Sequence, residues 1–269
     1  MRPIYATLTL IMGISLLFCS CRNDMDELYL AHPDDGVAMS FRISPYQQVP
    51  FDNEPHGRTV DVGSVCKHLL LAIYQNDNLD TLLSQQQGSE GFGHFPIVIE
   101  RGVYRIVVLA HSSEKQPDMS DPHKVNFGSK NMSDVLYWSD EIAVGRDSVI
   151  NVSLRRAVAK VVIRSTDSLP KQASQVYVRY DGSGTSFDAT TGKGFKSFGY
   201  EYINIPKESV GKPLSTSVYI FPSSKDTVRL KEVQLQISNK NGSIIDFQKV
   251  NDVPIKTNSI TRLTGRLHK

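Results

Sequence analysis

Residues 102–110 have the sequence GVYRIVVLA, and this stretch indicates the fold most directly. Apart from Arg105, the side chains on both of its alternating faces are apolar, as in a strand that is packed on both sides. Residues 149–154 and 176–180 instead carry apolar side chains at every second position, as in strands with one buried face. A period of two therefore dominates, and the sequence predicts an all-β protein.

Short strand patterns alternate with turn residues along the rest of the chain. The dipeptide Asn241-Gly242 favours a tight hairpin turn between strand patterns at 233–238 and 243–250. Residues 79–86 are the segment best able to form a short helix, and residues 112–134, with two prolines and little periodicity, predict a long surface loop. Many short strands joined by such turns predict β-sandwich architecture.

The domain organisation is indicated by two adjacent charges at Arg155-Arg156, where one outward-polar strand pattern ends and another begins. We expect an N-terminal β-sandwich domain over residues 37–155 and a C-terminal β-sandwich domain over residues 156–269. A single sandwich of this size is the alternative. The sequence shows no internal repeat.

The first 20 residues have the layout of a secretory signal peptide. Arg2 precedes an uncharged apolar stretch at 4–18, which is short for a membrane span of about 20 residues. Ser20 is the small residue that cleavage before Cys21 requires. Residues 17–21, LFCSC, resemble a bacterial lipobox, which implies acyl chains such as palmitate on Cys21. Several acyl chains give firm membrane attachment, and a single N-terminal transmembrane anchor is the alternative.

Residues 21–36 follow as an acidic tether, with the sequence DMDE at 24–27. This patch is either a solvated linker or a feature similar to the acidic export tag that sends lipoproteins of some Gram-negative anaerobes to the outer face of the outer membrane. We therefore expect a lipid-anchored protein of the outer membrane that faces the cell surface.

The charge balance and the cysteines exclude other classes. Lys and Arg number 30 against 28 Asp and Glu, so the chain offers no electrostatic basis for binding nucleic acid. Of the three cysteines, Cys19 leaves with the signal peptide and Cys21 carries lipid, which leaves Cys66 alone. The fold must then be stabilised by its hydrophobic core and not by an intrachain disulfide.

No catalytic or metal-binding pattern is visible in the sequence. The seven histidines are scattered without metal-ligand spacing, and the turn around Ser183 is not a nucleophile elbow. Residues 76–80 lack the glycine and the distal glutamate of a calcium loop. A carboxylate pair assembled by the fold would not show in sequence spacing. We predict a protein without enzymatic activity, metal or cofactor.

One aromatic cluster supports a different function. It lies at 187–202 around three glycines and comprises Phe187, Phe195, Phe198, Tyr200 and Tyr202. Strand aromatics of this kind form either part of the core or an exposed platform that stacks on sugar rings. A carbohydrate-binding lipoprotein of the cell surface is therefore the alternative function, with glycans as partners.

Four further stretches, together with the lipobox, carry a family resemblance. They are KHLLLAIY at 67–74, GVY at 102–104, LRRAVAKV at 154–161 and NSITRLTG at 258–265. In this order and spacing they resemble the FimB-type fimbrium anchoring subunits, which are fimbrillin-associated lipoproteins of Gram-negative anaerobes. The resemblance implies two tandem transthyretin-like β-sandwich domains of Greek-key topology. It also implies a non-enzymatic role in cell adhesion, in which the protein anchors a surface fibre to the outer membrane and terminates its growth.

The same resemblance implies fimbrial structural subunits as partners, joined by β-strand complementation. An anchor would keep its own first strand, and residues 37–43 are the candidate, with Val37, Met39, Phe41 and Ile43 facing inward. An ordinary first strand without a role in assembly is the alternative. The short segment after the last strand pattern lacks a tail to donate, which favours an anchor over a stalk subunit.

Overall fold

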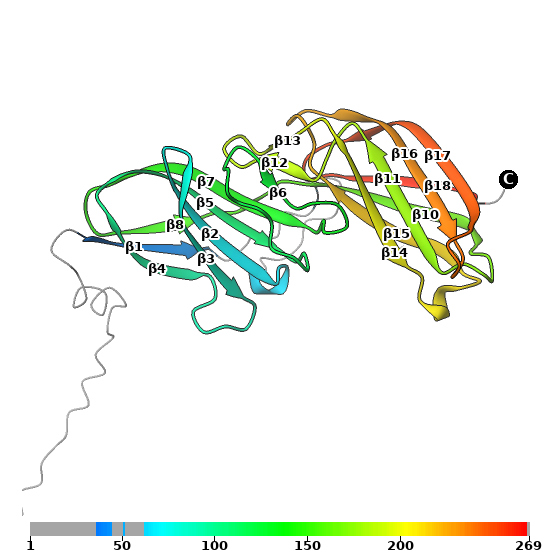
Figure 1. The fold of residues 1–269 in the computed structure, drawn as a ribbon, viewed down its shortest axis with the longest axis horizontal. Coiled ribbons are helices and arrows are strands. Elements are labelled where there is room, and N and C mark those ends of the chain that lie inside the picture. Colours follow the sequence, from blue (N-terminus) through cyan, green and yellow to red (C-terminus); the bar gives the residue numbers. More distant parts are fainter. Residues whose placement is uncertain (1–35, 45–50, 52–61, 268–269) are drawn as a thin grey trace, which may run out of the picture.

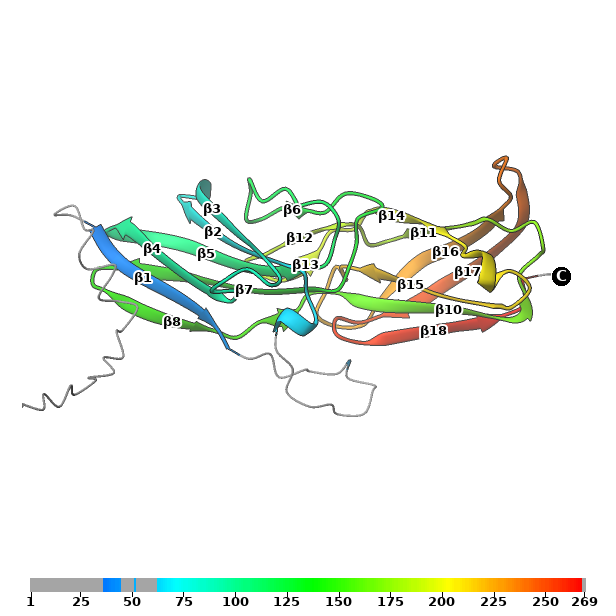
Figure 2. The same cartoon turned by 90° about the horizontal axis from the view of Figure 1, so that it is seen from below.

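The computed structural model describes residues 36–44, 51 and 62–267, and within them the fold is built almost entirely of β-strands. Two β-sandwiches lie end to end, and both views show the elongated shape that results (Figures 1 and 2). The prediction of an all-β sandwich protein is confirmed.

The first sandwich packs a three-stranded sheet, in the order β4-β1-β8, against a five-stranded sheet, in the order β3-β2-β5-β7-β9. Strand β1 pairs antiparallel with β4 and parallel with β8. A short 3-10 helix, η1 (Val62–Ser64), precedes β2. The strands are β1 (Gly36–Ile43), β2 (His68–Gln75), β3 (Asn78–Gln86), β4 (His94–Glu100), β5 (Gly102–His111), β7 (Val135–Val144), β8 (Ser148–Val152) and β9 (Arg155–Arg156).

The second sandwich repeats this topology. Its sheets have the orders β15-β10-β18 and β14-β11-β16-β17, and β10 again pairs antiparallel with one neighbour and parallel with the other. The strands are β10 (Ala159–Ser168), β11 (Gln175–Asp181), β14 (Phe198–Asn204), β15 (Pro213–Ile220), β16 (Val228–Ser238), β17 (Ile244–Ile255) and β18 (Ile260–Gly265), with the 3-10 helix η2 (Lys207–Ser209) before β15. The sequence shows no repeat because the two halves share strand pairing and not residues.

A small third sheet joins the two halves. It has the order β13-β12-β6, so β6 (Val125–Asn126) pairs with a strand from beyond Arg156, namely β12 (Ser186–Asp188), which pairs in turn with β13 (Lys193–Gly194). This sheet crosses the boundary placed at 155/156, and that division of the chain stays a proposal.

Strand β5 is buried on both faces from Ile106 onward, as its sequence predicts. Tyr104, Ile106 and Val108 belong to the core between the two sheets of the first sandwich. Val107 and Leu109 belong to a separate core under the small third sheet. That junction core also takes in Phe127, Phe187 and Phe221, which come from three distant segments.

One possibility and one prediction from the sequence do not hold. Residues 79–86 lie in β3 and not in a helix, because Asn76 and Asp77 adopt φ angles of 51° and 61° and close a hairpin with β2. Residues 112–134 are more than a surface loop, since Met119, Val125 and Phe127 are buried in the junction core. The predicted hairpin at Asn241-Gly242 is confirmed, with Gly242 at a φ of 80° between β16 and β17.

Candidate functional site

The predicted site residues fall partly outside the described residues. Ser20 and Cys21 lie outside them, so signal-peptide cleavage before Cys21 and lipidation of Cys21 stay predictions. The candidate retained strand is β1, in which Val37, Met39 and Phe41 are at most 1% exposed and belong to the first core. Ile43 is half-buried and packs against the same core.

Strand β1 occupies the middle of its sheet. It is paired with β4 from Gly36 to Arg42 and with β8 from Met39 to Ile43. Ser40, on the opposite face, is also buried, and its Oγ lies 2.7 Å from His94 Nε2. Removal of β1 would leave two sheet edges with free backbone groups on either side of an apolar channel. Strand complementation requires a gap of this form, and in this structure β1 itself fills it.

The aromatic cluster at 187–202 is divided between core and surface. Phe187 is fully buried in the junction core, whereas Phe198 and Tyr202 are 50% and 44% exposed. Phe195 is also exposed, and Tyr200 is half-buried. Each of the two sequence interpretations therefore holds for part of the cluster.

The exposed part forms an outer face of β11 and β14 that we call the aromatic face: Tyr177, Phe198, Tyr200 and Tyr202. Tyr177 lies opposite Tyr202, with ring centroids 4.8 Å apart and planes inclined by 43°. Lys130 places its Nζ 4.4 Å from the Tyr202 centroid, and the Arg179 guanidinium lies 5.2 Å from the Phe198 centroid. Aromatic rings of this kind can stack on a sugar ring, and the neighbouring cationic side chains can donate hydrogen bonds to its hydroxyl groups.

Sequence reasoning missed two residues of this surface. Tyr177 was visible as the outward-facing aromatic residue of the strand pattern at 176–180. Lys130 could not be predicted in the same way, because it lies in residues 112–134, for which the sequence predicts a surface loop.

The described ranges show where several residues that could perform chemistry lie. No group of three or more His, Cys, Asp or Glu side chains there could hold a metal ion. Cys66 is buried, and its Sγ donates a hydrogen bond to the Val62 carbonyl oxygen at 3.2 Å. Ser183 is fully buried with no hydrogen-bond partner for Oγ among these residues, so no adjacent base activates it.

His111 is the buried titratable group with the clearest consequence for pH. It is 1% exposed at the end of β5, stacked on His68 at 5.1 Å between ring centroids. Neither of its ring nitrogens has a hydrogen-bond partner in the described part of the chain. Burial, and to a lesser extent His68, lower the pKa of His111 to about 4. The native state therefore holds this ring neutral.

We predict that His111→Phe makes the protein less sensitive to acid. The unfolded chain protonates His111 near its ordinary pKa of 6.5, while the native state resists protonation down to a pKa of about 4. The wild type thus loses stability as pH falls from 6.5 to 4, and the variant is spared about 2 kcal/mol of that loss at pH 4.5. Urea unfolding at pH 7.5 and 4.5 measures the difference. Equal losses in both proteins would contradict the assignment.

Within the described ranges, we find no helix with the length and apolar character of a membrane span.

Comparison with known proteins gives a family and a shared fold. A model of a family of unknown function, DUF6562, matches residues 34–267. No curated protein matches the sequence. A candidate adhesin from Bacteroides ovatus matches with a TM-score of 0.52 at 12% identity over 90% of this chain and 88% of that one. At this identity the likeness shows the fold alone.

Two further solved structures are more distant. The fimbrial anchor protein Mfa2 from Porphyromonas gingivalis gives a TM-score of 0.43 at 12% identity, covering 79% of this chain and 82% of that one. A candidate polysaccharide-binding protein from Bacteroides thetaiotaomicron gives 0.45 at 10% identity, covering 78% and 79%.

Proposed function

The chain belongs to the DUF6562 family, whose function is unknown. We propose that this member is a non-enzymatic lipoprotein of the cell surface. It anchors a fimbrial fibre to the outer membrane and stops the fibre's growth. Acyl chains on Cys21 would hold it in the membrane. Fimbrial structural subunits would bind it by β-strand complementation. The fold that it shares with a candidate adhesin of Bacteroides ovatus is compatible with this role.

The observation that carries the proposal is the position of β1. This apolar strand is paired on both sides, so the gap that a subunit would need for an incoming strand is already filled. In strand complementation each subunit fills the gap of its neighbour. A chain that keeps its own first strand cannot accept one at this position, and growth ends there.

The test compares wild type with Cys21→Ala in the native organism. We expect fimbrial subunits to copurify with the wild-type lipoprotein from membranes, and fibres to be shed into the medium by the variant. Cys19→Ala is the matched control, because that cysteine would leave with the signal peptide. A wild-type lipoprotein that purifies without fimbrial subunits, together with unchanged shedding in the variant, would contradict the proposal.

Carbohydrate binding is the second candidate function, and the aromatic face favours it. Three of its residues, Tyr177, Tyr200 and Tyr202, contact one another through ring faces and edges at the surface. A glycan array probed with the purified protein would identify ligands. Tyr202→Ala should weaken the binding of these ligands about tenfold, which corresponds to about 1.4 kcal/mol of binding free energy. Val103→Ala, an exposed change on the first sandwich, should bind as wild type. An array without binding would exclude this candidate.

A further inference from the structure

The repeated topology allows the two sandwiches to be compared strand by strand, and they differ at one edge. In the first sandwich, β9 pairs with the outer edge of β7 at Leu136 and Tyr137. In the second, β17 is the counterpart of β7, and among the described residues it pairs with β16 alone. Strand β17 spans 12 residues, so a long row of backbone donors and acceptors faces outward.

This unpaired edge also exposes apolar side chains. Ile244, Phe247 and Val250 are 60%, 45% and 42% exposed. Edge strands are usually protected by charged residues, and β7 follows that rule with Asp140 and Glu141 exposed beyond the reach of β9. On β17 the exposed Lys249 and Asp252 are each paired with a charged side chain of β16, and the exposed apolar side chains beside them leave a surface that favours pairing with another strand.

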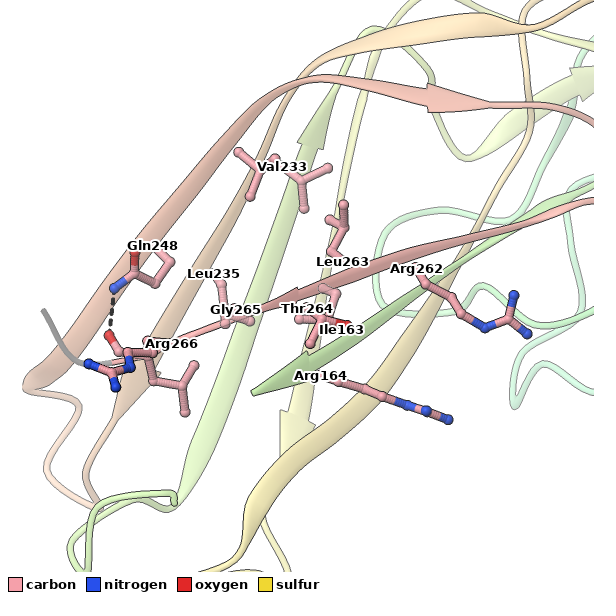
Figure 3. Close-up of a pocket in the computed structure, with 12 residues that line it drawn as sticks. Ile163, Arg164, Val233, Leu235, Gln248, Arg262, Leu263, Thr264, Gly265 and Arg266 are labelled. Atoms are coloured by element: carbon pink, nitrogen blue, oxygen red, sulfur yellow. Dashed lines mark hydrogen bonds between the residues drawn. The ribbon is translucent and has the colours of Figure 1, made fainter. Parts of the chain in front are cut away.

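Beside this edge, the core of the second sandwich is open. A cavity of about 480 Å³ lies between β17 and β18, and Figure 3 shows side chains from β10, β16 and β18 around it. Its apolar wall comprises Ile163, Val233, Leu235, Val250, Leu263 and Leu267. Arg164 and Arg262 alternate with Ile163 and Leu263 along β10 and β18, so their side chains point to the opposite face of the sheet and away from this wall (Figure 3). The cavity thus suits apolar side chains.

We infer that the β17 edge and this cavity accept an extended polypeptide strand from another protein. The strand pairs with the free backbone groups of β17. Because successive side chains of a strand point to opposite faces, its alternate apolar residues enter the cavity. A small ligand would leave the β17 backbone unpaired, and direct pairing of two β17 edges would leave the cavity unfilled.

The place of the second sandwich in the molecule agrees with this assignment. It lies at the end away from the start of β1, and therefore away from the lipid predicted upstream of β1 (Figure 1). A partner bound there would extend away from the membrane. The open edge and the cavity are features of the second sandwich itself. Only the identification of the donor as a fimbrial subunit rests on the proposed function.

The experiment supplies a donor strand within the same molecule. The chain from Arg22 onward is extended after Lys269 by a Gly/Ser linker and a ten-residue strand of alternating Val and Thr residues. A short linker suffices, because Gln248 of β17 already donates a hydrogen bond to the Leu267 carbonyl oxygen. Such a linkage gives an effective concentration in the millimolar range, which makes weak strand pairing measurable.

We expect the fusion to raise the Tm of the protein by about 4 °C or more and to slow amide exchange at alternate residues of β17. Two matched controls should lose both effects: a donor with Asp in place of its Val residues, and the acceptor variant Val250→Lys. Equal Tm and exchange for the apolar donor and its Asp control would overturn the inference.

A second outcome would also overturn it. If the unfused chain forms a concentration-dependent dimer in which β17 is already protected, and Val250→Lys abolishes that dimer, a second copy closes the edge. The assay contains neither lipid nor fibre, so its result is independent of the Cys21→Ala comparison.

Discussion

Replacing Arg156 with methionine is expected to lower the free energy of unfolding by about 3–5 kcal/mol, because the change leaves a largely buried carboxylate without its partner. The Arg156 side chain is 5% exposed, and its Nε lies 2.8 Å from Asp134 Oδ1. A second nitrogen donates to Asp134 Oδ2 at 2.9 Å, and a third to Asn258 Oδ1 at 2.6 Å. The guanidinium also lies 4.0 Å from the Phe51 ring centroid.

The contacts of Arg156 join the two sandwiches. Asp134 directly precedes β7 of the first, and Asn258 precedes β18 of the second. A planar guanidinium satisfies both partners at once, which the flexible ammonium of a lysine cannot do with the same geometry. We therefore expect Arg156→Met to loosen the junction as well as to destabilise the fold.

Urea unfolding followed by the fluorescence of Trp138, the chain's single tryptophan, measures the loss. Arg155→Met is the matched control, since Arg155 is exposed and should change stability by no more than about 1 kcal/mol. Adding Asp134→Leu to Arg156→Met should recover most of the loss, because the unpaired charge is then gone. A single variant within 1 kcal/mol of wild type would contradict the assignment.

The sequence shows two adjacent arginines at the proposed domain boundary, but nothing in it indicates that Arg155 is exposed and Arg156 is buried. Arg155 lies over the Tyr137 ring at the surface, and Arg156 is buried between sandwiches. The partners of Arg156 are 22 and 102 residues away in the chain. Local periodicity carries no information about such contacts, so the pair could not be predicted.

Residues 79–86, which could have formed a short helix, show how a bulge can imitate helical spacing. Leu79, Leu82 and Leu83 are spaced as on one face of a helix. The pairing of β2 with β3 shifts register between Ile73 and Tyr74, which inserts an extra residue at Asp80. The bulge brings Leu79 and Leu82 to the junction core, and Leu83 packs against the first core.

Where burial follows a period of two, the sequence predicted the structure well. From Ile106 onward, the strand at 102–110 is packed on both sides because its two apolar faces meet two cores. The junction core itself was not predictable, because Phe127, Phe187 and Phe221 lie in short or irregular segments without a period. Only the fold brings their rings to centroid separations of 5.5 and 4.6 Å.

Phe41→Ala in β1 is expected to lower the stability of the first sandwich by about 3–5 kcal/mol. Phe41 is fully buried and lies opposite Phe95 of β4 and Ile150 of β8, so its ring fills the centre of the first core from the middle strand. Truncation leaves a cavity and weakens the attachment of β1 to both neighbours. Amide exchange should accelerate in β4 and β8, while β11 and β16 of the second sandwich keep their protection.

The matched control for Phe41→Ala is Val149→Ala, which removes a 40% exposed side chain from β8 in the same sheet and should cost about 0.5 kcal/mol or less. The Phe41→Ala variant also tests whether β1 fills the gap between β4 and β8. If β1 is released more often in Phe41→Ala, a synthetic peptide of residues 36–43 should bind the variant and slow exchange in β4 and β8 again, and it should not bind the wild type. Unchanged amide exchange in β4 and β8 of the variant would contradict this assignment. It would mean that hydrogen bonds alone, without the core contacts of Phe41, hold β1 between β4 and β8.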